Sequence, residues 1–393
     1  MKIKGFLQDV GGAGRVTKKR EELFSQADKT DKANDPISAV AKELHPDPMM
    51  LTITEITVVS PTAKKYRLIA KDGVLPPFQA GQYVSLEMKI GDTLTTRPYS
   101  ICSAPFEARN GKDSFIEITV RKGRECNFVA NYFYNEAKVG SEFRASLPFG
   151  HFYYEELRDA KNIVALAGGS GITPFYSMAK EIEHGTLDVN LTILYGSVST
   201  KDIILNKELS AIKSEKVRFI NVISGEDDYQ GEKGFITADL IKKYSQGDTS
   251  YFVCGPLAMY NFVASELKKL KIPQRRIRME IFGAPSDISK AKGYPQGLED
   301  KVFSLTVIRG IHQDVIPALA KENLADAIER AGIKIPTNCR SGACGFCRCK
   351  LEKGEVFVPQ VGNGRRKADE EANYIHACST YPLSDCTVKI PIL

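Results

Sequence analysis

Four cysteines near the carboxyl end of the chain constrain its fold more than any other feature. Cys339, Cys344 and Cys347 follow the pattern C-x4-C-x2-C, and Cys378 stands after thirty intervening residues. This spacing is typical of a loop that holds a [2Fe–2S] cluster. The residues between the first three cysteines, in "CRSGACGFC", are mostly small, so backbone N–H groups can approach the bridging sulfides. The sequence therefore predicts an iron–sulfur site with these four thiolates as ligands.

Zinc is the alternative metal for such thiolates, but zinc sites usually consist of two short cysteine pairs. Cys349 lies two residues beyond Cys347, yet the spacing is complete without it. We therefore expect Cys349 to be a small buried residue, and we expect the same of Cys102, Cys126 and Cys386. Nine cysteines, an odd number crowded toward one end, fit reduced thiolates in a cytosolic protein better than a secreted disulfide framework.

Length and charge narrow the class of protein. A chain of 393 residues is expected to form several domains of about 100–150 residues. The net charge of +6 is modest and forms no basic tract interleaved with aromatic residues, so no nucleic-acid partner is expected. The first residues contain no apolar signal segment, and no run reaches the roughly 18 apolar residues of a membrane span. We expect a cytoplasmic protein without stable membrane insertion.

Changes in the pattern of apolar and polar residues divide the chain into five parts. Short alternating segments such as "LTITEITVV" and "QYVSLEMKI" predict a small antiparallel β-barrel. Further on, apolar strands such as "NIVALA" and "LTILYGS" alternate with amphipathic stretches, which predicts an α/β domain with a parallel sheet. The expected parts are an extension of unknown role at 1–48, the barrel at 49–158, the α/β domain at 159–285, a linker at 286–300 and the cysteine-rich domain at 301–393.

The last of these parts resembles a known family. The segments "NCRSGACGFCRCKLEKGEV" and "ACSTYPLSDCTVKIP" are similar to plant-type ferredoxin domains, and the resemblance covers residues 301–393. It implies an α+β β-grasp fold with one [2Fe–2S] cluster, a carrier of single electrons. Free ferredoxins of this type are strongly acidic, whereas this segment has a small positive balance. A tether to its own electron source would make electrostatic steering unnecessary.

Two upstream motifs indicate such a source. In "RPYS", Arg97 can pair with a flavin phosphate, Tyr99 can stack on the isoalloxazine ring and Ser100 can donate a hydrogen bond near N5. A strand end with a buried tyrosine would look the same. In "GGSGITPF", glycines follow a strand and open a helix, so a pyrophosphate can approach the backbone at a helix N-terminus. The residues expected there are Gly168, Gly169, Gly171, Thr173 and Pro174.

Taken in order, RPYS, GGSGITP, "CGP" and "EIF" resemble the motifs of the ferredoxin–NADP reductase superfamily over roughly residues 49–285. The resemblance implies a flavin barrel followed by a nicotinamide-nucleotide domain. It places Ser100, Cys254 and Glu280 around the site of hydride transfer and makes Phe282 the aromatic residue that covers the flavin until nicotinamide displaces it. It also implies cofactor-binding roles for Arg97, Pro98, Tyr99, Gly255 and Pro256. With the ferredoxin domain attached, the chain is similar to reductases that serve oxygenases or hybrid-cluster proteins.

FAD is expected in preference to FMN. In FAD-binding members a small-residue loop ends in Ser before a helix, whereas here "CNFVANYFY" has Asn127 at the glycine and Ala130 at the serine position. The following "LPFGHF", with Pro148 and Gly150, is nevertheless similar to the FAD-type members. Arg121, after "EITV", is expected to reach the flavin phosphates.

NADH is expected in preference to NADPH, because an arginine near the end of the second strand would suit a 2′-phosphate. Val198, Ser199, Thr200 and Lys201 stand there instead. NADPH remains possible, since Lys201 or the hydroxyls can hold a phosphate.

The predicted function follows from the number of electrons that each cofactor transfers at a time. Nicotinamide gives up two electrons as hydride, the cluster accepts one at a time, and a flavin can do both. We therefore predict an NAD(P)H:acceptor oxidoreductase that passes electrons through flavin and a [2Fe–2S] cluster to a protein acceptor, such as an oxygenase or a hybrid-cluster protein. The alternative is a redox-sensing iron–sulfur module, which would not need the hydride-transfer motifs.

Overall fold

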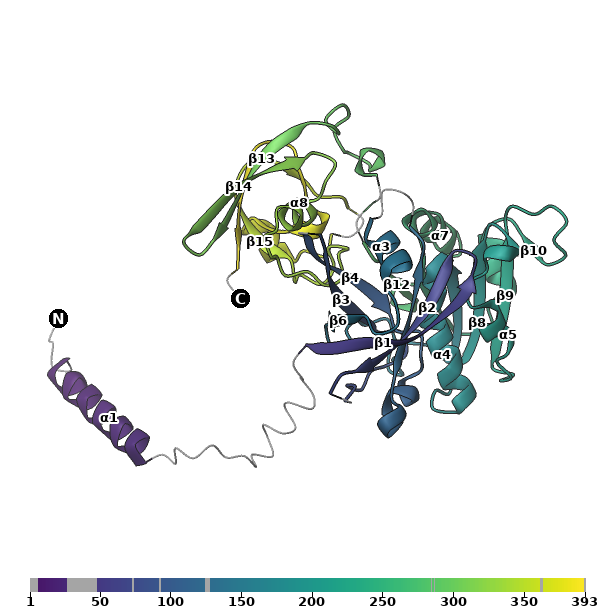
Figure 1. Cartoon of the computed structure of the whole chain (residues 1–393), viewed down its shortest axis with the longest axis horizontal. Coiled ribbons are helices and arrows are strands. Elements are labelled where there is room, and N and C mark those ends of the chain that lie inside the picture. The colour runs from purple at the N-terminus through teal and green to yellow at the C-terminus, as the bar shows by residue number, and fades with distance from the viewer. Residues whose placement is uncertain are drawn as a thin grey trace. The chain divides into compact units, whose positions relative to one another are not determined.

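The computed structural model describes residues 6–26, 48–72, 74–91, 93–123, 128–283, 285, 287–360 and 363–391. The chain divides into two units, residues 1–46 and 47–393. The first unit contains the helix α1 (Phe6–Gln26), whose described side chains are mostly exposed. Everything below concerns the second unit, which carries three large sheets (Figure 1).

The first sheet is antiparallel and has the strand order β4-β3-β6-β1-β2-β5. A bridge between Ile101 and Ile118 joins the end of β4 to β5, so the sheet closes into a barrel. Alternation places Leu51, Ile53 and Leu68 in a buried apolar core, as the sequence pattern predicts. The elements are β1 (Met49–Ser60), β2 (Ala63–Ala70), β3 (Tyr83–Ile90), β4 (Thr93–Ser100), η1 (Pro105–Arg109), η2 (Gly111–Asp113), β5 (Ile116–Arg121), α3 (Phe128–Glu136) and β6 (Glu142–Ala145).

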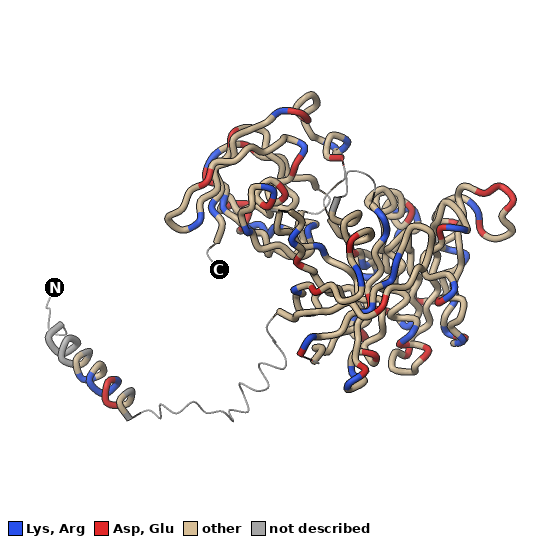
Figure 2. The backbone as a smooth tube through the Cα atoms, viewed as in Figure 1, with Lys and Arg blue, Asp and Glu red and all other residues tan. Residues whose placement is uncertain are grey.

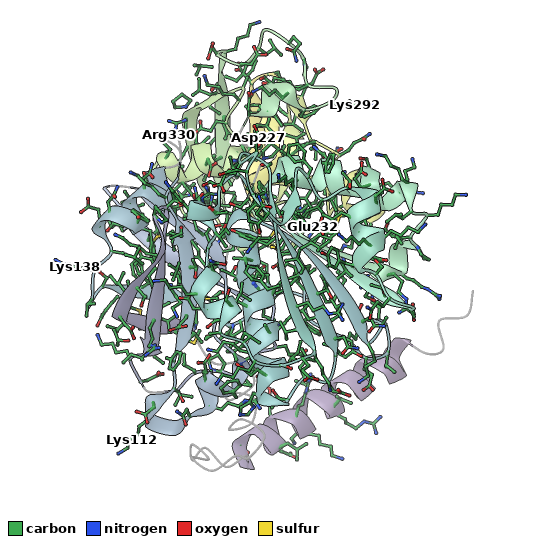
Figure 3. The ribbon with its side chains drawn as sticks, turned by 90° about the vertical axis from the view of Figure 1, so that its right-hand side faces the viewer. Lys112, Lys138, Asp227, Glu232, Lys292 and Arg330 are labelled. Atoms are coloured by element: carbon green, nitrogen blue, oxygen red, sulfur yellow. The ribbon has the colours of Figure 1, made fainter. Side chains whose placement is uncertain are left out.

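The second sheet is parallel, with the order β10-β9-β8-β7-β11-β12. Its central strands are buried on both faces because helices cover both sides, which explains their unbroken apolar sequences. Figure 3 shows the structure with its side chains after a turn of 90°. The elements are β7 (Asn162–Gly168), η3 (Gly169–Ile172), α4 (Thr173–His184), β8 (Asn190–Ser197), η4 (Thr200–Asp202), α5 (Asn206–Ser210), β9 (Val217–Ile223), β10 (Glu232–Lys233), α6 (Ala238–Tyr244), β11 (Thr249–Cys254), α7 (Leu257–Lys269), η5 (Gln274–Arg276) and β12 (Ile277–Glu280).

The third sheet is mixed, with the order β14-β13-β19-β15-β17, and only β13 and β19 pair in parallel. The helix α8 packs against it, and Asn323 caps that helix by accepting the backbone N–H of Asp326 at 3.0 Å. The elements are β13 (Val302–Arg309), β14 (His312–Leu319), α8 (Leu324–Arg330), β15 (Arg348–Lys353), β16 (Val356–Phe357), α9 (Lys367–Glu371), β17 (Tyr374–His376), η7 (Ala377–Ser379), β18 (Tyr381–Pro382) and β19 (Cys386–Ile390). The predicted fold class is confirmed in all three parts.

The segment expected to be a linker is packed against the mixed-sheet region. It contains the short helix η6 (Ile288–Lys290), and Ile288 and Tyr294 are buried together with Tyr381. The turn-forming and charged residues of this segment indicated only that it lacks the regular spacing of apolar residues found in helices and strands. The two apolar anchors were not visible as a pattern because they are too far apart to form one.

Lys and Arg are interspersed with Asp and Glu along the backbone of the second unit (Figure 2). None of the helices among the described residues combines the length and apolar composition needed to cross a bilayer.

Candidate functional site

A cavity of about 760 Å³ lies between the barrel and the mixed-sheet region. The barrel lines it with Arg97, Pro98 and Tyr99, the predicted flavin residues, at the end of β4. Along β4 itself, Pro98 is paired with β3 alone, because the closure to β5 is made only by the bridge at Ile101, so Pro98 removes no ladder hydrogen bond from a second neighbour. The opposite wall includes Cys378, one of the predicted cluster ligands. A cavity of this size fits a cofactor or drug-sized ligand.

Two polar side chains in the cavity wall each have a hydrogen-bonding atom that is not used within the described part of the chain. Among the described residues, Arg340 Nε and the Tyr381 hydroxyl are buried without a hydrogen-bond partner. Buried polar atoms are normally paired, so such atoms in a cavity wall fit a polar ligand. Neither residue was predicted from the sequence, because each lies outside a recognisable flavin motif and enters the cavity only through the fold.

Arg97 is held at the cavity wall by several contacts. Its Nη1 donates to Thr95 Oγ1 at 2.6 Å and to the backbone oxygen of Thr96 at 2.8 Å. Its Nη2 lies 3.9 Å from Asp326 Oδ1, across the cavity. Burial and the neighbouring Arg340 guanidinium lower the pKa of Arg97. A cation in this position fits the phosphate of a flavin.

Tyr99 and Ser100 continue the same strand. The Tyr99 ring lies 5.5 Å from the Phe133 ring, so α3 supports it from behind. Ser100 is buried at the end of β4, where Tyr83 is its neighbour on β3. Ala130 on α3 also lines the cavity, whereas Asn127 lies outside the described residues.

The glycine-rich loop runs from the end of β7 through η3 into α4, as predicted. A Cβ atom on Gly171 would lie 2.2 Å from the backbone oxygen of Cys254, so only glycine allows the two loops to meet. Gly169 adopts φ 55°, which favours glycine. Thr173 donates its hydroxyl hydrogen to the Ser170 oxygen at 2.8 Å, and Pro174 stands in the first turn of α4. The loop therefore has the form of a pyrophosphate cradle at a helix N-terminus.

The loop after β11 faces this cradle. Cys254 is buried, and burial followed by the charge of Glu280 raises the pKa of its thiol. The backbone N–H of Gly255 donates to the Tyr260 hydroxyl at 3.2 Å. Pro256 occupies the N-cap of α7. The structure thus brings the GGSGITP and CGP motifs together at the carboxyl end of the parallel sheet.

Glu280 ends β12 beside Cys254. Its side chain is buried, and within the described part of the chain Oε2 has no hydrogen-bond partner. Burial, followed by the charge of Cys339, raises the pKa of this carboxyl well above its usual value. A Cβ atom on Gly150 would lie 3.4 Å from Glu280 Oε1, so this glycine of "LPFGHF" leaves room for the carboxyl group.

Phe282 lines the flavin cavity and meets the Tyr83 ring edge to face, with centroids 5.2 Å apart. The "LPFGHF" motif of the barrel contains Phe149, which follows Pro148. Its ring lies 5.4 Å from that of Phe346, in the cysteine loop. The barrel thus contacts both Phe282 and the cysteine loop through aromatic side chains.

The four predicted ligands lie in two pairs. Cys347 Sγ is 3.2 Å from Cys378 Sγ, and the backbone N–H of Cys344 points at Cys339 Sγ at 3.3 Å. No three of the described His, Cys, Asp or Glu side chains are grouped to hold a single metal ion. Two thiolate pairs are the donor arrangement of a two-iron cluster, whereas one zinc ion needs four donors around one point.

Backbone N–H groups also approach the sulfurs, as the small residues of the loop predict. Gly342 donates to Cys378 Sγ at 3.3 Å, and Ser341 to Cys339 Sγ at 3.5 Å. Cys349 is fully buried in the core of the mixed-sheet region. Cys102 and Cys386 are buried as well, and Cys126 lies outside the described residues.

Arg121 does not line the flavin cavity. Its guanidinium forms an ion pair with Asp202, which follows β8. A Cβ atom on Gly169 would lie 3.1 Å from Arg121 Nη1, so this side chain reaches the glycine-rich loop. The sequence could not reveal this, because the barrel strand and the loop meet only in the fold.

A carboxylate also lies at the end of β8. Glu226 Oε1 accepts hydrogen bonds from Ser199 Oγ at 2.6 Å and from the backbone N–H of Thr200 at 2.8 Å. These bonds lower the pKa of Glu226. The sequence does not reveal the role of Glu226, since it belongs to the loop after β9 and not to the end of β8 itself.

Comparison with known proteins assigns three families in order along the chain. Residues 50–154 match the oxidoreductase FAD-binding domain, residues 165–265 the oxidoreductase NAD-binding domain and residues 312–383 the 2Fe-2S iron-sulfur cluster binding domain. The chain is 28% identical over 349 residues to the ferredoxin reductase component of 3-ketosteroid-9-alpha-monooxygenase from Mycobacterium tuberculosis, covering 85% of this chain and 93% of the relative. It is 27% identical over 343 residues to the glycine betaine monooxygenase reductase subunit of Chromohalobacter salexigens, covering 83% and 91%.

A solved structure has the same fold. Phthalate dioxygenase reductase aligns with a TM-score of 0.66 and 22% identity, over 88% of this chain and 98% of that one. The fold and the three matched domains define a flavin and iron–sulfur oxidoreductase that takes electrons from NAD(P)H and passes them through FAD to a [2Fe–2S] cluster. The three matched domains confirm the resemblance to flavoproteins of the ferredoxin–NADP reductase superfamily that carry a carboxyl-terminal [2Fe–2S] domain. Below, β1–β6 form the flavin barrel, β7–β12 the nucleotide domain and β13–β19 the ferredoxin domain.

Proposed function

We propose that this reductase delivers its electrons to an oxygenase. The relatives named above are reductase components of monooxygenases, and this chain covers nearly their whole length. One structural observation supports the relay most strongly: Tyr99 of the flavin barrel and Cys378 of the ferredoxin domain line the same cavity. A hybrid-cluster protein is the second acceptor class, supported only by the resemblance described above.

FAD, when bound, supplies the conversion between a two-electron hydride and single electrons. Arg97 binds a flavin phosphate, while Pro98 and Tyr99 shape the wall against which the ring system rests. Ser100 offers a hydroxyl at the buried end of β4. Tyr381 and Arg340 add polar contacts from the ferredoxin side.

At the site of hydride transfer, Cys254 and Glu280 exclude water and orient the nicotinamide, since both are buried and burial raises the pKa of each. Phe282 covers the flavin cavity until the nicotinamide displaces it. Gly168, Gly169 and Gly171 let the pyrophosphate reach the start of α4. Thr173 and Pro174 fix that helix start, and Gly255 and Pro256 fix the facing loop.

Two further residues refine nucleotide binding. We assign Arg121 to the nucleotide pyrophosphate, because it lies beside Gly169 and outside the flavin cavity. We assign Glu226 to the choice of NADH. A carboxylate held by Ser199 and Thr200 can accept the hydroxyls of an adenosine ribose and repels a 2′-phosphate.

At the exit, Cys339, Cys344, Cys347 and Cys378 ligate the cluster in the two pairs described above. The domain limits that we propose remain 49–158, 159–285 and 301–393, with the connection at 286–300 anchored on the ferredoxin domain. None of the eight described cysteines forms a disulfide, which supports a reducing compartment and therefore the cytoplasm.

The acceptor is testable by crosslinking the reductase to its partner in the native host and isolating the complex. We expect an iron-containing oxygenase that becomes reduced by NADH only when this chain is present and then consumes O2 with its substrate. A captured acceptor that is reduced by NADH but does not use O2 contradicts the oxygenase assignment and favours the hybrid-cluster class.

A further inference from the structure

A row of polar side chains joins the flavin barrel to the ferredoxin domain. Ser85 Oγ donates to the backbone oxygen of Asn338 at 3.2 Å, and both residues are buried. The hydroxyls of Thr96 and Thr337 are also hydrogen-bonded to each other. These contacts link the adjacent strands β3 and β4 to the segment before the cysteine loop. We call the whole row the polar seam: Ser85, Thr95, Thr96, Glu329, Thr337, Asn338 and Arg340.

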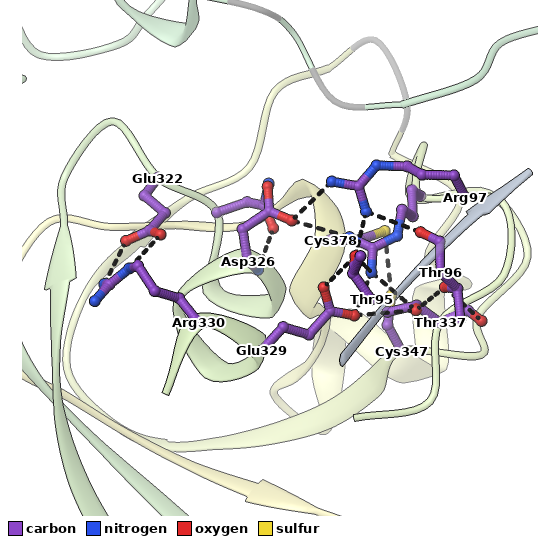
Figure 4. A network of polar contacts seen from close by, with 12 residues as sticks. Thr95, Thr96, Arg97, Glu322, Asp326, Glu329, Arg330, Thr337, Cys347 and Cys378 are labelled. Carbon is purple, nitrogen blue, oxygen red and sulfur yellow. Dashed lines mark hydrogen bonds and ion pairs between the residues drawn. The ribbon is translucent and has the colours of Figure 1, made fainter. Parts of the chain in front are cut away.

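Thr95 is the centre of the polar seam (Figure 4). Its hydroxyl donates to Glu329 Oε2 at 2.9 Å and accepts from Arg340 Nη2 at 3.1 Å and from Arg97 Nη1 at 2.6 Å. A hydroxyl offers one donor and two acceptor positions, so these three bonds use its full capacity. A single barrel side chain therefore engages the acid and the base of an ion pair on the ferredoxin domain.

The ion pair between Arg340 and Glu329 is almost completely buried, with 5% and 4% of the side chains exposed. Taking two charges out of water costs about as much free energy as their attraction returns, so such a pair adds little stability. It does favour one geometry, because any position that leaves a buried charge without its partners is penalised. The seam therefore fixes the orientation of the domain more than it strengthens its attachment.

The polar seam lies beside both redox sites. Arg340 directly follows the cluster ligand Cys339, and Arg97 belongs to the flavin motif. Tyr99 and Cys378 line the cavity next to the seam. Electron tunnelling weakens exponentially with distance, so a small shift of the ferredoxin domain would slow transfer strongly.

We infer that the polar seam holds the ferredoxin domain in its electron-accepting position, with Thr95 and Arg340 as positioning residues for transfer from the flavin to the cluster. The inference rests on transfer within this chain and not on the identity of the acceptor. Transfer then needs no diffusive search. A domain that moved freely on its connection would instead depend on an effective concentration, on the order of millimolar, and on solvent viscosity.

The test uses the full-length enzyme with complete FAD and cluster. In anaerobic stopped-flow experiments NADH reduces the flavin, and the absorbance of the cluster then reports internal transfer. The variant Thr337→Val removes a seam hydroxyl that does not line the flavin cavity, so hydride transfer to the flavin should keep its rate. Thr95→Val removes the central hydroxyl with little change of shape. Thr57→Val is the control, since Thr57 is another barrel threonine whose hydroxyl is hydrogen-bonded, to Glu55, but it does not line the cavity.

We expect internal transfer in the wild type and in Thr57→Val to be independent of added glycerol. Thr95→Val should slow internal transfer by about tenfold or more, because losing a hydrogen bond to charged groups lowers the docked fraction. Thr337→Val should have the same effect to a smaller degree. In both variants the slowed rate should fall further as viscosity rises, and the radius of gyration from X-ray scattering should increase.

Wild-type transfer that already slows in proportion to viscosity would overturn the inference. So would unchanged transfer in Thr95→Val, or slowing that is independent of viscosity with an unchanged radius of gyration. If single variants of the ion pair fail to fold, Arg340→Met with Glu329→Met removes both charges together and leaves neither stranded. This double variant should fold, keep the cluster signal in electron paramagnetic resonance, and show the viscosity-dependent transfer.

Discussion

The flavin barrel meets its two neighbours in different ways. With the nucleotide domain it shares one apolar core, in which Phe152 packs between Phe175 and Phe252 at 5.7 and 5.3 Å. With the ferredoxin domain it is joined by the polar seam and by the edge-to-face contact between Phe149 and Phe346. The described apolar core of the ferredoxin domain contains residues of that domain alone.

The difference corresponds to what each boundary must do. Nicotinamide must lie against the flavin while hydride moves, so a continuous core keeps the two domains as one body. The ferredoxin domain has to present its cluster to the flavin and later to an acceptor. Directional polar contacts define one position without merging the domains, and they can be altered one at a time.

The largest functional effect is expected at the exit of the relay. Cys347→Ser removes a cluster ligand and should lower NADH-dependent cytochrome c reduction by about 100-fold or more, because the single-electron exit is lost. Ferricyanide, a small acceptor that takes electrons from the flavin, should still be reduced. Equal activity toward cytochrome c would mean that electrons leave from the flavin side of the molecule.

The shared core should give the largest effect on stability. Phe152→Ala should lower the free energy of unfolding by about 3–5 kcal/mol, and calorimetry should show the barrel and the nucleotide domain unfolding together. Ile311→Ala, at a residue 96% exposed on the ferredoxin domain, serves as the control with almost no change. Separate transitions for the two domains would refute the idea of one body.

Within the nucleotide domain, Glu226→Gln should relax the preference for NADH. Loss of the negative charge should improve kcat/KM for NADPH by about tenfold, with little change for NADH. Glu232→Gln is the control, since that carboxylate pairs with Lys243 instead; Figure 3 labels Glu232. An unchanged ratio of the two nucleotides would place the 2′ position elsewhere.

Glu280 makes stability depend on pH. Its pKa in the folded state lies well above the unfolded value of 4.5, so the folded state binds the extra proton between these two values. The wild type should therefore lose stability as pH rises through that window. Glu280→Gln cannot ionise, and its stability relative to the wild type should increase with pH. Chemical unfolding at several pH values measures this, and parallel curves for the two proteins would show that Glu280 titrates normally.

The smallest effect on the relay is expected for Cys349→Ser. Cys349 lies in the ferredoxin core, and its sulfur has no place in the two ligand pairs. The variant should keep the paramagnetic signal of the reduced cluster. Its free energy of unfolding should fall by about 1–3 kcal/mol, because a hydroxyl is buried in place of the thiol. Loss of the signal in this variant, together with its retention in Cys378→Ser, would reverse the ligand assignment.

Sequence reasoning succeeded where function depends on short contiguous motifs. RPYS, GGSGITP, CGP and the cysteine loop each carry their chemistry in adjacent residues, and the alternation of β1 or the apolar run of β7 indicates its sheet type. The four cysteines predicted a cluster because ligand spacing in a loop is itself a geometric constraint.

Contacts between distant segments could not be predicted in this way. Thr95 and Arg340 are more than two hundred residues apart. Nothing in the sequence around either residue distinguishes it from an ordinary exposed threonine or arginine. The position of Arg121 beside Gly169, and of Glu226 at the end of β8, likewise depends on how separate strands are placed. Such residues become visible only when the fold brings their partners together.

An anaerobic titration with dithionite, followed by absorbance and electron paramagnetic resonance, tests the relay most directly. The full-length enzyme should take up about three electrons, two on the flavin and one on the cluster. NADH should then produce the cluster signal without any added mediator. Two results would contradict the passage of electrons from nicotinamide through flavin to the cluster held by the four cysteines. One is the uptake of only two electrons without that signal, and the other is a cluster that only dithionite can reduce.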